Sequence, residues 1–144
     1  MGFHHVRPDP VGELGDNTVL DTSVHPPRVE HLHFEIDAWT GSDLIGRFPV
    51  LLVTDRLAES LTRSGFSSFE LRSAEVTFAP EAEEFRAAAG IGTFPTFHCL
   101  HVTGTPGRDD LGTTPQARLV VSDRALALLH DHNVTHCDTS PYDG

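Results

Sequence analysis

The apolar residues between positions 48 and 66 predict a buried strand that runs directly into a helix. Residues 48–53 form a short apolar run of the kind found in buried strands. Thr54 is a favourable N-cap, and Asp55 follows it where the helix dipole stabilises a carboxylate. The predicted helix has one apolar face, made by Leu57, Ala58 and Leu61. Gly65 is placed to end the helix in the left-handed conformation.

The same order of apolar and polar positions returns near the end of the chain. Residues 117–121 predict a second short apolar strand, and Ser122 is the N-cap of a helix over residues 125–132. Asn133 is the predicted left-handed cap of this helix, and residues 134–137 are the predicted final strand.

The remaining segments have simpler patterns. Residues 1–28 are rich in His, Pro, Gly and Asp without a sustained period, which predicts an irregular N-terminal arm, with a short strand over 18–20 as an option. The alternation in residues 29–37 predicts a strand. Extended structure is expected over 66–78, a linker or short exposed helix over 79–90, a strand over 96–102 and a long loop over 103–116.

A shift of 68 residues places the first strand–helix segment on the second. Val53-Thr54-Asp55-Arg56 then lies on Val121-Ser122-Asp123-Arg124, and residues 31–34 lie on 99–102. This agreement predicts one α+β domain over 29–144, made of pseudo-repeats 29–71 and 97–139. Each repeat is expected to be a strand-loop-strand-helix-strand unit, with the helices packed on a mixed or antiparallel sheet. Any two strand–helix units share such caps and leucine faces, so chance similarity is the alternative.

Charge restricts the classes of partner. The 144 residues include 21 acidic and 10 basic side chains, which gives a net charge of −11, and all ten basic residues are arginines. Such a surface repels phosphate backbones and anionic lipid heads, so neither nucleic acid nor membrane is an expected partner. A basic protein partner is compatible with this charge, although solubility alone also explains it. The start of the chain has no apolar core of a secretory signal, and the expected location is cytoplasmic.

Few residues indicate chemistry. The sequence contains no Ser-His-Asp spacing, phosphate loop or zincin motif, and we predict no cofactor. His33 or His101 could act as a general base if the two halves form a cleft. His31, His33, Cys99 and His101 could bind zinc if their strands were adjacent, but their spacing fits no zinc template, and no metal is predicted.

Acidic loops are the predicted binding surface. Asp43 lies in the loop of the first half, and Asp109 and Asp110 lie in the equivalent loop of the second. Long, exposed loops are where binding residues concentrate, so these carboxylates are candidate partner contacts. Trp39, the only tryptophan, lies beside the first loop and is either an interface anchor or a core residue.

One resemblance bears on function. Residues 48–57 and the segment Arg118-Leu-Val-Val-Ser-Asp-Arg, with the Asp109-Asp110-Leu111-Gly112 loop before it, resemble a group of uncharacterised small bacterial proteins whose relatives include immunity proteins of polymorphic toxin systems. The resemblance implies a non-enzymatic protein-binding module that neutralises a toxin partner. It carries over no catalytic residue. The alternative is a small biosynthetic accessory enzyme that uses His and Asp as acid and base in a cleft between the halves.

Overall fold

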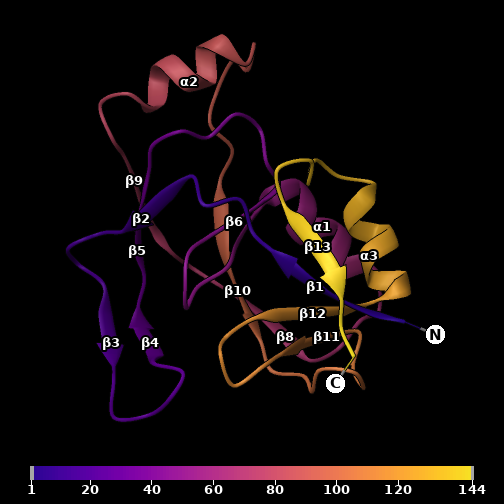
Figure 1. Ribbon diagram of the computed structural model, residues 1–144. Coiled ribbons are helices and arrows are strands. Elements are labelled where there is room, and N and C mark those ends of the chain that lie inside the picture. Colours follow the sequence, from indigo (N-terminus) through magenta and orange to yellow (C-terminus); the bar gives the residue numbers. More distant parts are fainter. Residues whose placement is uncertain (1, 144) are drawn as a thin grey trace.

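The computed structural model describes residues 2–143 and shows an α+β protein with three helices, antiparallel sheets and one mixed sheet, as the sequence predicts (Figure 1). The first antiparallel sheet consists of β1 (Phe3–Arg7), β11 (Leu111–Thr113), β12 (Leu119–Ser122) and β13 (Asp138–Pro141). Its order is β11-β12-β1-β13, so the N-terminal strand lies between two strands from the C-terminal part of the chain.

The second antiparallel sheet has the order β6-β7-β10-β8. Its strands are β6 (Leu44–Ile45), β7 (Leu52–Thr54), β8 (Phe69–Arg72) and β10 (Phe97–Val102). Two smaller sheets complete the fold. A mixed sheet has the order β2-β5-β9, with β2 (Gly12–Leu14), β5 (His33–Ile36) and β9 (Glu75–Phe78), and β3 (Val19–Asp21) pairs with β4 (Arg28–His31).

The helices are α1 (Asp55–Arg63), α2 (Ala82–Ala88) and α3 (Asp123–His130). Helices α1 and α3 lie side by side against the two four-stranded sheets, and α2 stands apart from them (Figure 1). None of the helices within residues 2–143 has the length and apolar character needed to cross a bilayer.

Both predicted helix starts are confirmed. The Thr54 hydroxyl accepts a hydrogen bond from the backbone N–H of Leu57, and the Ser122 hydroxyl accepts one from Ala125. Gly65 has a φ of +81°, as predicted for the cap of α1. The cap predicted at Asn133 is wrong, since this residue is not among those with positive φ in residues 2–143. Helix α3 instead ends at the cap residue Asp131, and the backbone N–H of Asn133 donates to the Asp43 carboxylate.

Several predicted segments are wrong in extent. The arm predicted over 1–28 contains β3, which overlaps the short strand considered at 18–20, and also β1 and β2, which were not predicted. Short strands stabilised by distant partners leave little periodicity in the sequence. The strand predicted over 29–37 is two strands in different sheets, β4 and β5. The final strand is 138–141 rather than 134–137, since it is fixed by pairing with β1, and the loop predicted over 103–116 contains β11.

Candidate functional site

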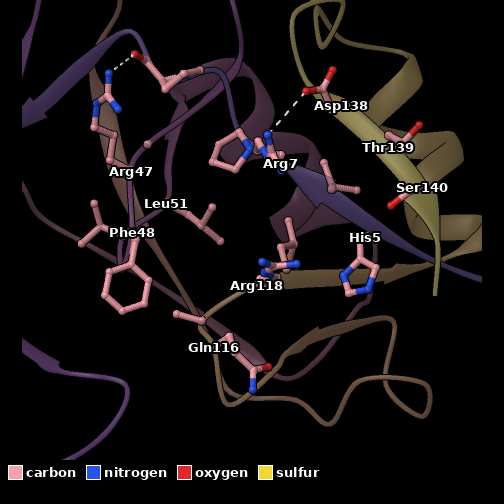
Figure 2. A pocket seen from close by; sticks show the side chains of 17 residues that line it. His5, Arg7, Arg47, Phe48, Leu51, Gln116, Arg118, Asp138, Thr139 and Ser140 are labelled. Atoms are coloured by element: carbon pink, nitrogen blue, oxygen red, sulfur yellow. Dashed lines mark hydrogen bonds and ion pairs between the residues drawn. The ribbon is translucent and has the colours of Figure 1, made fainter. Parts of the chain in front are cut away.

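An open cleft of about 730 Å³ lies beside β1, between β13 and two loops, residues 46–51 and 116–118 (Figure 2). β1 contributes His5 and Arg7, and β13 contributes Asp138, Thr139 and Ser140. The N- and C-terminal strands therefore meet the middle of the chain at this cleft. Its volume is in the range of small-molecule and peptide binding sites, so it is a candidate ligand site.

Arginine is concentrated in the cleft. Arg7, Arg47 and Arg118 all line it, and Asp138 is its only acidic lining residue. Within residues 2–143, Arg47, Arg118 and the distant Arg108 are the arginines that have no carboxylate within 4.0 Å. Arg7 has only a long contact, of 4.0 Å, with the exposed Asp138. An acidic protein thus keeps two unneutralised arginines in one cleft.

The backbone positions both of these arginines. The Nε–H of Arg47 donates to the carbonyl of Gly12, and Nη2 donates to that of Pro10 at 3.3 Å. Arg118 extends from a tight turn in which its own backbone N–H donates to the Thr114 hydroxyl at 3.1 Å. Ala117 in this turn has a φ of +61°, which is unfavourable for a residue with a side chain. The turn holds Arg118 at the cleft without using its guanidinium.

The remaining wall of the cleft is apolar. Phe48 lies at the edge of the cleft and is 56% exposed. It is next to the partly buried Leu51 and the buried Val50. Figure 2 shows Phe48 and Leu51 between the Arg47 and Arg118 side chains. Such a surface can bind an anionic group together with an apolar one. Sequence reasoning missed it because its arginines come from three distant segments.

The structure places Asp43 and Trp39 in the interior. Asp43 is 2% exposed, and its carboxylate accepts hydrogen bonds from the Thr54 hydroxyl, from Arg56 and from the backbone N–H of Asn133, at 2.7 Å each. Trp39 is a core residue that donates to the carbonyl of Ser42 at 2.8 Å. A second cleft of about 560 Å³ borders both residues at the start of α1. The loop exposure predicted for Asp43 is therefore wrong, because internal donors surround its carboxylate, and Trp39 follows the core alternative.

Asp110 has the same kind of contacts as Asp43 but lies nearer the surface. Its carboxylate accepts from the Ser122 hydroxyl at 2.6 Å and from two nitrogens of Arg124 at 2.9 and 2.6 Å. Asp109 is half-buried and accepts from the backbone N–H of Thr105 at 2.7 Å. Asp110 therefore holds the start of helix α3 in place, and Asp109 holds the turn of its own loop.

Acid should weaken the Asp110 cluster. The Arg124 guanidinium, followed by the Ser122 hydroxyl, holds the pKa of Asp110 below its ordinary value of 3.8. A carboxyl whose folded-state pKa is depressed stabilises the fold above its unfolded-state pKa and loses that contribution as the pH falls through the folded-state pKa. We expect Asp110→Asn to be less stable than wild type at neutral pH, and the difference to shrink below about pH 4. Urea unfolding at a series of pH values measures this, and a difference that stays constant down to about pH 2 contradicts it.

The two histidines considered as general bases lie in different sheets. His33 in β5 contacts the Thr77 hydroxyl at 2.8 Å, whereas His101 in β10 pairs with Glu70 of β8. Burial lowers the pKa of His101. None of the contacts within residues 2–143 joins the two rings, and neither histidine lines one of the two clefts.

Metal-ligating groups are also dispersed. Within residues 2–143 no cluster of three or more His, Cys, Asp or Glu side chains could hold a metal ion. Cys99 and Cys137 are free thiols. Burial raises the pKa of both, to about 11 for Cys137, so neither is a reactive thiolate.

A Ser–His–Asp series of contacts joins α1 to the residues that follow α3. The His132 Nε2 lies 2.8 Å from the Ser60 hydroxyl, and its Nδ1 lies 3.7 Å from the Asp43 carboxylate. The second distance exceeds a hydrogen bond, and the His132 side chain is only 9% exposed. Ser60 lies within α1 and lines neither cleft. This arrangement links the residues that follow α3 to α1.

Comparison of the chain with known protein families and with curated proteins found no match.

Proposed function

We propose that this chain is a non-enzymatic protein-binding module and that the arginine cleft is its partner surface. The observation that carries this proposal is the pair of unneutralised arginines, Arg47 and Arg118, beside the exposed ring of Phe48. Arginine and aromatic side chains are enriched in protein interfaces and dominate their energetics. An exposed aromatic ring beside guanidinium groups without carboxylate partners has the composition of an interface hot spot.

This proposal reverses the charge expected for the surface of the partner. The acidic loops were expected to contact a basic protein, but Asp43 and Asp110 already bind Arg56 and Arg124 of the same chain. A partner that used these carboxylates would have to displace internal arginines. The cleft has free cationic groups, so it supports a partner with a locally acidic surface. Neutralisation of a toxin, which the resemblance implies, is one form of this proposal.

Photo-crosslinking tests the proposal. We expect p-benzoylphenylalanine at position 48 to form an adduct with one protein in cells of the source organism, because the ring stands exposed at the rim of the cleft. Phe85 in α2 is also exposed but lies outside the cleft, so the same group at position 85 should not form this adduct. Mass spectrometry of the adducts is the measurement.

Two charge variants make the result specific. Arg118→Glu should reduce the adduct at position 48 by about tenfold, whereas Arg108→Glu should leave it unchanged. Both arginines are exposed and lack a carboxylate partner, but only Arg118 lines the cleft. Equal adducts from positions 48 and 85, or equal effects of the two variants, would refute the proposal. Coexpression then tests whether the chain protects cells from the captured protein.

We also infer an internal repeat with different boundaries from those predicted. Three observations support it. The orders β6-β7-β10-β8 and β11-β12-β1-β13 place corresponding strands beside α1 and α3. Asp43, Thr54 and Arg56 make the contacts that Asp110, Ser122 and Arg124 make. Asp55 pairs with His98 of β10, as Asp123 pairs with His4 of β1.

In this proposal the first strand of each repeat is β1 or β10, and it pairs within the sheet of the other repeat. Residues 31–34, which the shift of 68 placed on 99–102, lie in other sheets, and the segment that contains them is an insertion between strands of the first repeat. The exchange of β1 brings the start of the chain beside its end, where the arginine cleft forms.

A further inference from the structure

The cationic groups of the cleft are available but separated from one another. A guanidinium has five N–H donors, and Arg47 uses two of them on the carbonyls of Gly12 and Pro10. Three donors of this held group are left, and the Arg118 side chain makes no hydrogen bond within residues 2–143. A guanidinium can bind a carboxylate through two parallel N–H···O bonds; Arg47 offers one that is already held in place, and Arg118 offers one that is free to move. The cleft is therefore prepared for carboxylates at more than one point.

The shape of the cleft favours an extended ligand over a compact anion. Figure 2 shows Arg47 and Arg118 on different sides of the cleft, with Leu51 between them in this view. One phosphate-sized ion at either arginine would leave the other arginine and the Phe48 ring uncovered. An extended peptide can place carboxylates at both arginines and an apolar side chain against Phe48 and Leu51.

The charge of the whole chain restricts the ligand further. At a net charge of −11, a long polyanion such as nucleic acid is repelled everywhere outside the cleft. A short acidic segment carries its charge only where the arginines lie. Asp138 is the one carboxylate in the cleft, 4.0 Å from Arg7, and it competes with such a segment for Arg7.

We propose that the cleft binds an extended acidic peptide segment of the partner, with carboxylates on Arg47 and Arg118 and an aromatic or aliphatic side chain against Phe48. This rests on the proposed function and specifies the chemistry of the partner. The Asp138 carboxylate then acts as an internal competitor that weakens the contact at Arg7.

The direct test measures binding of defined peptides to the full chain by fluorescence anisotropy. The probes are three 12-residue peptides: one of Glu, Tyr and Ser, one of Glu and Ser, and one of Lys, Tyr and Ser. We expect the first to bind at least about tenfold more tightly than either other peptide, and its affinity to fall with added salt, because the contacts are ionic. Inorganic phosphate and a single-stranded 12-nucleotide DNA should bind more weakly than the first peptide.

Three variants locate the site. Arg118→Glu should lower the affinity for the Glu/Tyr/Ser peptide by at least about tenfold, and Arg108→Glu should change this affinity by less than about twofold. Asp138→Asn should raise the affinity several-fold, because it removes the internal competitor for Arg7. The side chain of Arg118 makes no hydrogen bond within residues 2–143, so this variant should fold, which circular dichroism verifies. Tighter binding of DNA or phosphate, equal binding of the Lys peptide, or equal effects of Arg118→Glu and Arg108→Glu would overturn the inference. If crosslinking at position 48 succeeds while every acidic peptide fails, the proposed function stands and this inference is wrong.

Discussion

Val6→Asp should unfold the part of the molecule around α3, although it lies in a segment whose sequence looks irregular. Val6 is 4% exposed in the middle strand of the β11-β12-β1-β13 sheet, where it pairs with Leu119 on one side and Thr139 on the other. Its side chain belongs to the core cluster that includes Leu129 of α3. An unpaired carboxylate in that position would cost more than about 3 kcal/mol, a large part of the stability of a small protein.

A matched exposed valine provides the control. Val24 is exposed, so Val24→Asp should change the free energy of unfolding by less than about 0.5 kcal/mol. Urea titration followed by circular dichroism gives both values. Similar small effects of the two substitutions would show that β1 is a dispensable arm, and the exchanged-strand repeat would then be wrong.

Asp43→Ala should be the most destabilising of the single carboxylate substitutions in the two loops. The substitution removes a buried acceptor and leaves the backbone N–H of Asn133 and one face of Arg56 without their partner. It also removes the carboxylate 3.7 Å from the buried Nδ1 of His132, which has no hydrogen-bond partner within residues 2–143. The Arg56 side chain is 66% exposed and is solvated after the substitution, so the cost comes mainly from the donors left without an acceptor, at about 1–3 kcal/mol each.

The second loop offers a natural comparison. Asp110 binds Arg124 and Ser122 in the same way, but part of its carboxylate is reached by water, which can replace the lost contacts. Asp110→Ala should therefore cost about 1–2 kcal/mol. Thermal and urea unfolding of both variants measure the difference. A cost at Asp110 equal to or larger than that at Asp43 would contradict the role assigned to burial.

The resemblance between the two loops shows what kind of information a sequence pattern contains. The shift of 68 residues paired Thr54 with Ser122, which are both helix caps, and the two loops treated as equivalent contain Asp43 and Asp110, which bind these caps. It could not tell that these acids bind their own arginines rather than a partner. An aspartate in a Gly-rich loop has the same sequence signal in either case, because exposure depends on what packs over the loop.

Local interactions are what the sequence by itself determined. The starts of α1 and α3, their apolar faces and the left-handed Gly65 each depend on residues within one or two turns of each other, so the pattern alone predicted them. The acidic character and the α+β class also followed from composition and periodicity. None of these features required knowledge of a distant segment.

Tertiary structure alone decided the position of β1 and the existence of the arginine cleft. β1 is a strand because β12 and β13 supply its hydrogen bonds from more than 100 residues away. Arg7, Arg47 and Arg118 line one cleft only because that pairing brings the first strand beside the last one and beside the loop of residues 46–51. Strand pairing and the convergence of distant side chains depend on non-local contacts. The periodicity of one segment reflects only local burial and therefore cannot predict them.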